Sequence, residues 1–382
     1  MSNKFKEDDL KNIACHFCKI NEINNIIELK SGNINSTFFV KLNKNCSRSD
    51  FILQYINIYA FRDFENITHN YSILTKHIEH NIFSSSNQLI YNNFTFARLI
   101  PSNLTSNYIV NYKDSFWRAI TYINNSTTLH SLSNASQAFE LGLALSKFHL
   151  VTSNIDKSIL FDSIADFHNT SKYLAKLNSS IGKCRSFNNY SLISSKLFSK
   201  TIDLFYSLKF DYREILKAES QRKLSKYPTH GDPKITNFLF DINQEKVKAL
   251  IDYDTFQNGL YIIDIADLLR SCCNLIDEDS SDFDSVDFDL SYFKASLEGY
   301  FTISNPLFTY SDFVYLPQAI LQLPYELGVR FLNDYINGDK YFITTYPSQN
   351  LHRALIQFNL FVSIKSKLNN ILNVIKKFNE SI

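Results

Sequence analysis

Glycine is scarce in this sequence, with 8 glycines among 382 residues, which excludes Gly-rich repeat folds. A basic excess is also absent: 39 Lys and Arg residues stand against 38 Asp and Glu, so a dedicated nucleic-acid-binding protein is not expected. No window approaches 18 uninterrupted apolar residues, and the first twelve residues lack the apolar core of a secretory signal. We therefore expect a cytoplasmic protein that binds neither nucleic acid nor membrane.

The six cysteines do not form a recognisable framework. Without an export signal, they are expected to be reduced thiols. Cys15 and Cys18 form a CxxC pair, but a zinc site normally needs a second ligand pair at a defined spacing, and none follows. We expect this pair to lie on an amphipathic helix over residues 1–20.

Apolar periodicity divides the chain into a β-rich first part and a helical remainder. Strands are predicted over residues 26–29, 36–40, 51–55, 88–91, 94–100 and 116–122. Helices are predicted over residues 1–20, 64–80, 137–150 and 350–379, and residues 124–128 form a polar break. The pattern predicts an α+β protein with a small sheet-containing lobe over residues 1–122 and a larger, mainly helical lobe over residues 123–382.

The common nucleotide-binding and metalloprotease motifs are missing. GxxxxGK[ST], GxGxxG and HExxH do not occur, which argues against P-loop, Rossmann and HExxH zinc enzymes. The informative stretch is residues 229–270, where Asp232 is followed five residues later by Asn237. Phosphoryl transfer needs a carboxylate that orients the attacking hydroxyl, and Asp232 is placed at the start of such a loop. Lys234, two residues on, is placed to meet the transferring phosphate.

A hairpin then predicts a metal site. Asn237 opens an apolar run, a polar turn follows, and a second run over residues 247–251 delivers Asp252. The hairpin should bring Asp252 back beside Asn237. Because Mg²⁺ prefers oxygen ligands and keeps phosphates and waters in its shell, one amide and one carboxylate suffice to hold it.

The combination HGDxxxxN and IDxD, over residues 230–237 and 251–254, resembles the aminoglycoside phosphotransferase/choline kinase superfamily. Within it, the chain more closely resembles the N-acetylhexosamine 1-kinase branch. That likeness extends to both ends of the chain. It is carried by residues 32–37, 52–54, 330–341, 346–347 and 350–353.

The resemblance implies a bilobal, protein-kinase-like fold, ATP and Mg²⁺ as cofactors, and a small sugar as the acceptor. Asp232 would act as the base on the anomeric hydroxyl, and Asn237 and Asp252 would hold Mg²⁺. The remaining implied residues are Arg330 against the sugar, Asp254 either facing the sugar or supporting the site, and a phosphate-covering loop with Gly32, Asn33, Asn35 and Thr37. On the third strand, where the superfamily usually carries a lysine that grips the phosphates, this sequence has Gln54.

Other polar residues have structural interpretations. His149 and His168 lie in helical, aromatic surroundings and are expected to be structural. Asp264 is expected to cap a helix and Asp267 to lie in its first turn. The acidic run over residues 277–289 is expected to be a solvated loop.

Two alternative functions remain open at this point. One is a kinase for another hydroxylated metabolite, such as an aminoglycoside, choline or an amino alcohol. The other is a non-catalytic pseudokinase that binds nucleotide, which the substitution at Gln54 suggests.

Overall fold

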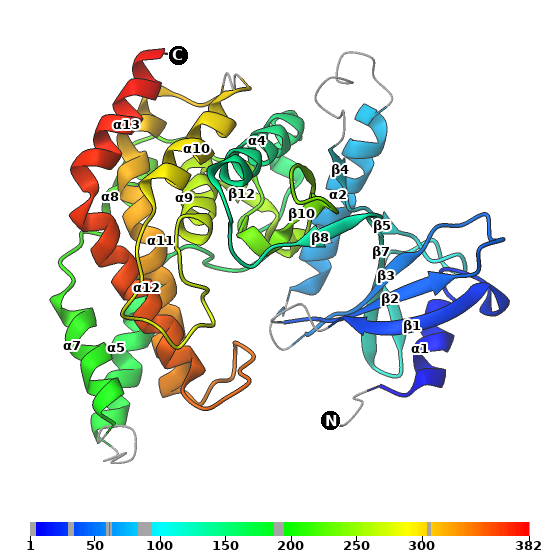
Figure 1. The fold of residues 1–382 in the computed structure, drawn as a ribbon. Coiled ribbons are helices and arrows are strands. Elements are labelled where there is room, and N and C mark those ends of the chain that lie inside the picture. Colours follow the sequence, from blue (N-terminus) through cyan, green and yellow to red (C-terminus); the bar gives the residue numbers. More distant parts are fainter. Residues whose placement is uncertain are drawn as a thin grey trace. The chain divides into compact units, whose positions relative to one another are not determined.

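The computed structural model describes residues 5–29, 34–58, 61, 63–82, 94–186, 195–303 and 307–381 (Figure 1). The chain divides into two compact units. Unit 1 comprises Met1–Ser126, Ile155–Ile164 and Ile251–Gln257. Unit 2 comprises Thr127–Asn154, Ala165–Leu250 and Asn258–Ile382.

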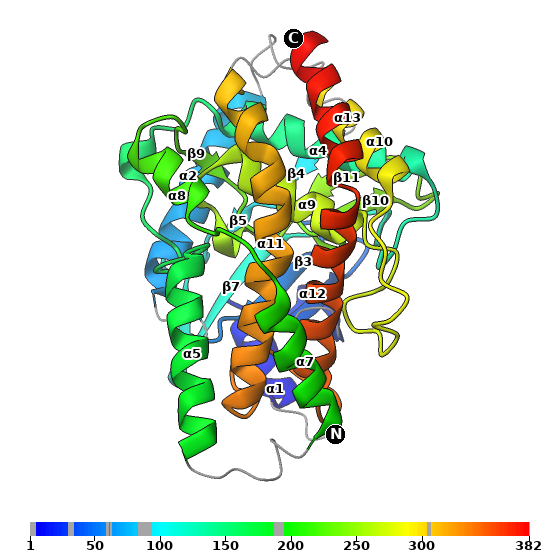
Figure 2. The ribbon, with the colours of Figure 1, turned by 90° about the vertical axis from the view of Figure 1, so that its left-hand side faces the viewer.

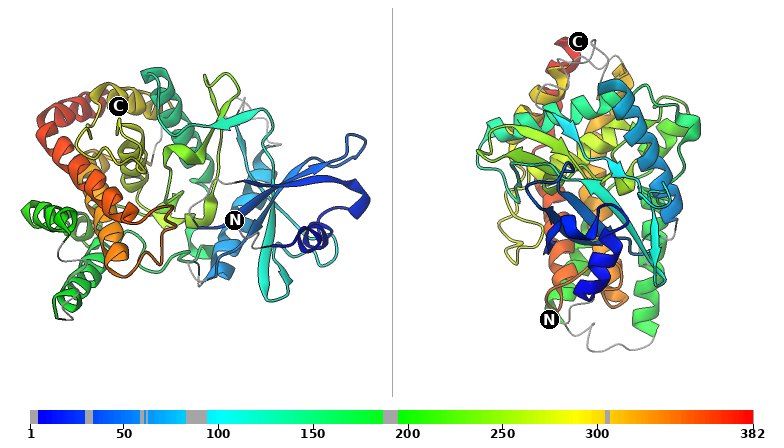
Figure 3. Two further views of the ribbon diagram at one scale, coloured as in Figure 1. Left: turned by 60° about the horizontal axis from the view of Figure 1, so that its bottom comes forward. Right: turned by 90° about the vertical axis from the view of Figure 1, so that its right-hand side faces the viewer.

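Unit 1 is built on an antiparallel sheet with strand order β1-β2-β3-β7-β5, and β6 pairs with β7. The strands are β1 (Ile23–Leu29), β2 (Ser36–Leu42), β3 (Phe51–Tyr55), β5 (Leu99–Ile100), β6 (Val110–Tyr112) and β7 (Ser115–Thr121). Burial alternates along β2 and β3, so that one face of the sheet forms a core with α1 (Glu7–Ala14), which lies beneath the strands in the left view of Figure 3. Unit 1 also contains α2 (Phe64–Ile82) and the short strand β4 (Thr95–Phe96).

Unit 2 is mainly helical, with α11 at its centre and α12 alongside it (Figure 2). Its helices are α4 (Ala135–Thr152), α5 (Thr170–Ser186), α7 (Lys196–Ser207), α8 (Glu214–Ser220), α9 (Tyr261–Cys272), α10 (Leu290–Phe301), α11 (Tyr310–Ile336), α12 (Gln349–Ser366) and α13 (Leu368–Ser381). Its strands are β9 (Tyr227–Thr229), β10 (Phe238–Asp241) and β11 (Val247–Leu250). The strands β8 (Ser126–Thr128) and β12 (Gln257–Gly259) lie where the chain passes from one unit to the other.

Two of the few glycines allow α4 and α10 to approach closely. A Cβ at Gly142 would lie 1.9 Å from the carbonyl oxygen of Ser296, and one at Gly299 would lie 1.9 Å from that of Phe139. Any side chain at either position would force the helices apart. The packing of α4 against α10 therefore requires glycine on both helices.

The structure confirms the α+β class and most of the predicted elements, and it corrects several boundaries. The helix predicted over residues 1–20 ends at Ala14, because the amides of His16 and Phe17 bond to carbonyls three residues back and tighten the chain into a turn. The strand predicted over residues 94–100 is two short strands, β4 and β5. The strand predicted over residues 88–91 lies outside the described residues.

The long C-terminal helix is interrupted. It was predicted over residues 350–379, but α12 ends at Ser366 and α13 begins at Leu368. The ammonium group of Lys367, at the break, donates to the Asp287 carboxylate at 2.5 Å and to the Phe288 carbonyl at 2.7 Å. Among the described residues, none of the helices combines the length and apolarity needed to span a membrane.

Candidate active site

The loop that carries Asp232 is held by a buried carboxylate. After β9 the chain turns at Gly231, whose φ of 87° favours glycine. The backbone amides of His230 and Gly231 donate to the two oxygens of Asp264, at 2.7 and 2.9 Å. Asp264 is 1% exposed and lies inside α9, which begins at Tyr261. The prediction that Asp264 caps this helix is therefore wrong, since its side chain binds the loop instead.

His149 extends this contact into the core. Its Nε2 lies 2.9 Å from the Asp264 carboxylate, and its Nδ1 lies 2.8 Å from the Tyr300 hydroxyl. The ring is fully buried and stacks on Tyr261 at a centroid distance of 4.2 Å. Because both ring nitrogens have partners inside unit 2, His149 has the structural role that the sequence predicts.

The structure brings Asp232, Lys234 and Asn237 together. The Lys234 ammonium lies 2.7 Å from Asp232 Oδ2, and both side chains remain about 30% exposed. Asn237, at the end of the 3₁₀ turn Ile235–Asn237, donates from Nδ2 to the Asp232 carbonyl at 2.8 Å. Burial raises the pKa of Asp232, but the charges of Lys234, Arg270 and His230 outweigh it, so the pKa is lowered overall. Asp232 is therefore a carboxylate at neutral pH.

A buried ion pair lies on α9. Arg270 Nε is 2.7 Å from Asp267, and Arg270 Nη1 is 3.0 Å from Glu278. Burial raises the pKa of Asp267, the nearby charge of Asp232 raises it further, and Arg270 opposes both. Asp267 lies in the middle of α9, so the first-turn position expected for it is wrong.

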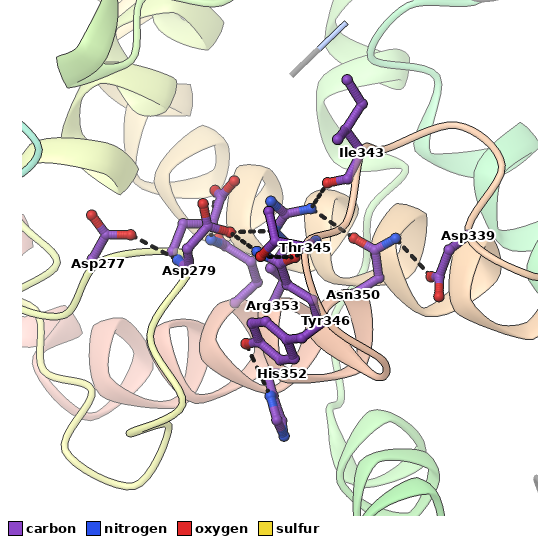
Figure 4. A network of polar contacts seen from close by, with 12 residues as sticks. Asp277, Asp279, Asp339, Ile343, Thr345, Tyr346, Asn350, His352 and Arg353 are labelled. Carbon is purple, nitrogen blue, oxygen red and sulfur yellow. Dashed lines mark hydrogen bonds and ion pairs between the residues drawn. The ribbon is translucent and has the colours of Figure 1, made fainter. Parts of the chain in front are cut away.

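The acidic run over residues 277–289 is not simply a solvated loop, as the sequence suggested. Glu278 contacts Arg270, and Asp279 lies 2.6 Å from Arg353 on α12 (Figure 4). Asp289 accepts hydrogen bonds from the first amides of α10. The run thus contacts α9, α10 and α12, and its contact with α12 joins residues that lie 74 positions apart in the sequence.

The loop between α11 and α12 is organised by Asp334 and Asn350. Asp334 accepts hydrogen bonds from three consecutive amides, those of Lys340, Tyr341 and Phe342, at 2.9 to 3.0 Å. Asn350 donates to Asp334 at 3.1 Å. Figure 4 shows Asn350 reaching Asp339 on one side and Arg353 on the other. These contacts fix the position of the two aromatic residues at 341 and 342.

Arg330, on α11, is surrounded by aromatic rings. Its guanidinium carbon lies 5.3 to 5.9 Å from the ring centroids of Phe167, Tyr173, Tyr341 and Phe342. Within the residues that the structure describes, its guanidinium makes no hydrogen bond or ion pair. Burial lowers the pKa of Arg330, but Tyr173 and Tyr341, and after them Glu326 and Asp232, raise it overall. The guanidinium is therefore charged and lies within electrostatic range of Asp232.

His168 contacts the backbone of the Asp232 loop. Its Nδ1 lies 3.0 Å from the Glu326 carboxylate and its Nε2 lies 3.1 Å from the Gly231 carbonyl. Since both partners are acceptors, only the imidazolium form can donate to both. Burial lowers the pKa of His168, but Glu326 and Asp267 raise it above the usual value overall. His168 is structural, as predicted, and it also supports the loop that carries Asp232.

Replacement of His168 by glutamine is expected to destabilise the protein most at mildly acidic pH. The folded-state pKa is raised, so the stabilisation is complete below the usual pKa of histidine and is lost as pH rises through the raised value. The Tm difference between wild type and His168→Gln should be largest at pH 6 and smallest at pH 9. His130→Gln, at an exposed histidine, is the control. Parallel Tm profiles across this range would contradict a charged His168.

In unit 1, the structure gathers several residues predicted to bind nucleotide. Thr37 on β2 pairs with Gln54 on β3, and Gln54 Nε2 donates to Thr37 Oγ1 at 3.3 Å. Asn35 donates to Asp254 Oδ2 at 2.8 Å. Gly32 and Asn33, predicted for the same site, lie outside the described residues.

Arg118, which the sequence analysis missed, joins these residues into one network. It lies opposite Gln54 on β7 and donates to Gln54 Oε1 from Nε at 2.9 Å and from Nη2 at 2.6 Å. Its Nη2 also lies 2.5 Å from Asp254 Oδ1. The signal that could have found it is a single arginine in the apolar run of residues 116–120, which is unusual for a half-buried strand.

Asn237 lies just before the hairpin formed by β10 and β11, and Asp252 lies just after it. β10 pairs with β11 so that Phe238 lies opposite Leu250, which confirms the predicted hairpin. Asp252 itself adopts a left-handed backbone conformation, with φ 69° and ψ 67°. This conformation is uncommon for a residue other than glycine, although aspartate adopts it more readily than most. Asp252 belongs to unit 1 and Asn237 to unit 2.

The sequence matches the model of the phosphotransferase enzyme family (APH) over residues 25–298. The fold is similar to an aminoglycoside phosphotransferase from Alicyclobacillus acidocaldarius, at 18% identity and a TM-score of 0.55, over 94% of each chain. A choline kinase from Cryptosporidium parvum matches at 14% identity and a TM-score of 0.55, over 98% of this chain and 99% of that one. A microcompartment-associated aminopropanol kinase matches at 13% identity and a TM-score of 0.57, over 97% and 98%. These likenesses show a protein-kinase-like fold.

Proposed function

The chain belongs to the phosphotransferase enzyme family, and we propose that it transfers the terminal phosphoryl group of ATP to the anomeric hydroxyl of an N-acetylhexosamine. The products would be ADP and GlcNAc or GalNAc 1-phosphate, formed by direct in-line transfer. A small-molecule phosphotransferase acting on a hydroxyl group follows from the family, and the acceptor is the proposal. Residues 1–122 would bind the nucleotide, and residues 123–382 would carry the catalytic loop and bind the sugar.

The surroundings of Asp232 in unit 2 support an acceptor that offers oxygen atoms, and Arg330 is the observation that carries this argument. Lys234 is paired with Asp232, Arg270 with Asp267 and Glu278, and His168 with Glu326. Arg330 makes no hydrogen bond or ion pair with a described residue, although the charges of Glu326 and Asp232 act on it. A guanidinium whose planar set of donors is unused favours a ligand that offers oxygen atoms.

The aromatic surroundings of Arg330 point the same way. Four rings around a cation are the arrangement that binds a quaternary ammonium group such as that of choline. Here the protein's own guanidinium occupies that position. The N–H groups of Arg330, which make no hydrogen bond with a described residue, suit hydroxyl and acetamido oxygens. An N-acetylhexosamine therefore fits these residues better than choline, an amino alcohol or an aminoglycoside.

Asp232 is proposed as the base. Its Oδ2 contacts Lys234, and its carboxylate is partly exposed and ionised. It can therefore accept a hydrogen bond from the anomeric hydroxyl, orient that oxygen towards the phosphorus atom and take its proton as the new bond forms. Lys234, held 2.7 Å from the base, is proposed to stabilise negative charge on the phosphoryl group.

Asn237 and Asp252 are the proposed Mg²⁺ ligands. Asn237 Nδ2 is used in the contact with Asp232, so Oδ1 is the atom of this side chain that remains for a metal. An amide oxygen and a carboxylate form a donor set that suits Mg²⁺, which keeps phosphate and water oxygens as its other ligands. When bound, the ion would supply charge neutralisation to the phosphates of ATP.

The polar residues of unit 1 are proposed to bind the nucleotide. They are Asn35, Thr37 and Gln54, together with Gly32 and Asn33. Of the two roles predicted for Asp254, support of the site is favoured over contact with the sugar, because its two carboxylate oxygens already contact Arg118 and Asn35.

An acceptor panel tests the proposal. ADP release from ATP and Mg²⁺ is measured with GlcNAc, GalNAc, kanamycin, choline and ethanolamine as separate acceptors. The N-acetylhexosamines should give saturable ADP release above the rate without acceptor. Turnover with the amines alone would contradict the proposed acceptor, and nucleotide binding without turnover on any acceptor would instead indicate a pseudokinase.

Replacement of Arg330 by methionine is expected to raise the KM for the sugar by about 10- to 100-fold, the value of one or two hydrogen bonds from a charged donor. The KM for ATP should not change. Arg213→Met, at an exposed arginine paired with Asp211, is the matched control. An unchanged sugar KM in Arg330→Met would remove Arg330 from the acceptor site.

A further inference from the structure

Arg118 is a charged residue at a position where the sheet itself does not need one. Among the described residues of unit 1, Arg118 and Asp254 are the only Asp, Glu, Lys or Arg side chains that are buried. Their side chains are 2% and 4% exposed. Burying an ion pair costs about as much in lost hydration as the pair returns, so an apolar pair would serve the sheet equally well.

The hydrogen-bond donors of Arg118 are only partly used. A guanidinium has five N–H groups. Gln54 Oε1 accepts from Nε and Nη2, and Asp254 lies against Nη2. Nη1 makes no hydrogen bond with any described residue. Nη1 is not one of the fully buried atoms that lack a partner, so this edge of the guanidinium is accessible and can donate to an acceptor on a ligand.

The neighbours of Arg118 hold that edge in a fixed direction. Gln54 and Asp254 contact one side of the guanidinium, and the centroid of the Tyr71 ring lies 5.6 Å from its central carbon, Cζ. Asp254 is itself held by Asn35, whose Oδ1 accepts from the Asn57 amide at 3.0 Å. A planar cation whose orientation is already fixed loses little entropy when it binds phosphate oxygens.

The register of the sheet places this cation beside the residues proposed to bind the nucleotide. Thr37 pairs with Gln54, and Gln54 pairs with Arg118, so the three lie in one row across β2, β3 and β7 on the same face. Gln54 cannot supply a positive charge, but Arg118, one strand away, can. The cation that is missing from β3 is thus present on β7.

We propose that Arg118 binds the phosphate groups of the nucleotide, with Gln54 and Asp254 orienting its guanidinium. This inference rests on the proposed function only in that the ligand is a nucleoside di- or triphosphate, and it does not depend on which acceptor is phosphorylated. If Arg118 supplies the positive charge, the glutamine at position 54 no longer favours the alternative of a non-catalytic pseudokinase.

Calorimetric titration of the full-length protein with adenosine and with ADP plus Mg²⁺ tests the role of Arg118. In the wild type, ADP should bind more tightly than adenosine. Arg118→Met should weaken ADP binding by about 10- to 100-fold and leave adenosine binding unchanged, because only the phosphate contacts are lost. Arg118→Lys should fall between the two, since it keeps the charge but not the planar fork. Arg98→Met, which removes an arginine of the same unit paired with Glu79 at the surface, is the control and should match the wild type.

A double variant that moves the positive charge from Arg118 to its partner position, Gln54, distinguishes an effect on binding from an effect on folding. The double variant Gln54→Lys/Arg118→Met moves the cation from β7 to β3 and should recover at least part of the lost ADP affinity, even if Arg118→Met alone folds poorly. Equal losses for adenosine and ADP in Arg118→Met, or no loss for either, would overturn the inference. A wild type that does not prefer ADP over adenosine would also overturn it. If ADP binding behaves as expected and no sugar is phosphorylated, the inference stands and the proposed acceptor is wrong.

Discussion

Asp232→Asn is expected to lower kcat by about 10²- to 10⁴-fold, the usual value of a general base. The amide has nearly the shape of the carboxylate and retains an oxygen for Lys234, but it cannot accept the proton of the sugar hydroxyl. ADP binding should be unaffected, because Asp232 is not among the residues proposed to bind the nucleotide. Steady-state ADP release with a saturating sugar measures the effect.

Two comparisons make the Asp232 result specific. Asp211→Asn, at an exposed aspartate paired with Arg213, changes the same charge elsewhere in unit 2 and should leave kcat at the wild-type value. The loss in Asp232→Asn should appear equally in kcat and kcat/KM, as expected for an interaction made in the transition state. Turnover close to that of the wild type would show that Asp232 is not the base.

Asp264→Ala is expected to lower the free energy of unfolding by about 3–5 kcal/mol, one of the largest effects of a single substitution in this chain. The carboxylate accepts from the amides of His230 and Gly231 and contacts His149 Nε2. Removing it would leave these buried groups without their acceptor. The Tm should fall by about 5 to 10 °C, measured by thermal melting at pH 7.

Because the same carboxylate holds the Asp232 loop, Asp264→Ala should also reduce kcat in the fraction of protein that remains folded. Asp264→Asn keeps the shape and one acceptor, so its Tm should lie between those of wild type and Asp264→Ala. Asp211→Asn again serves as the control. A Tm within about 1 °C of the wild type in Asp264→Ala would show that the loop does not depend on this residue.

The sequence predicted the parts of the candidate site that depend on short-range spacing. Asp232, Lys234 and Asn237 lie within six residues of one another, and the turn after residue 241 fixes the hairpin, so local patterns sufficed. Strands β1, β2, β3 and β7 of unit 1 were also predictable, since their apolar patterns are local, whereas the three-residue strand β6 was not predicted. The resemblance to the family was also carried by these motifs, and the match of the family model over residues 25–298 confirms it.

The residues that hold the site depend on contacts that no local pattern reveals. Arg118 meets Gln54 only through the pairing of β3 with β7, across 64 residues of sequence. A helix cap is predicted from the residues next to it in the sequence, and on that basis Asp264 was predicted to be one. Its actual partners, His230 and Gly231, lie more than 30 residues away. Lys367, at the break in the last helix, likewise has a distant partner, since Asp287 lies 80 residues away in the sequence.

The central claim is that the chain phosphorylates a neutral sugar at its anomeric oxygen, and ³¹P NMR of the reaction mixture tests it most directly. The protein is incubated with ATP, Mg²⁺ and GlcNAc or GalNAc, and the phosphorus signals are followed with time. We expect a sugar 1-phosphate, split by coupling to the anomeric proton, to grow in step with ADP. Formation of ADP with inorganic phosphate alone, or of a phosphate ester only when an amine-bearing acceptor is supplied, would contradict the account.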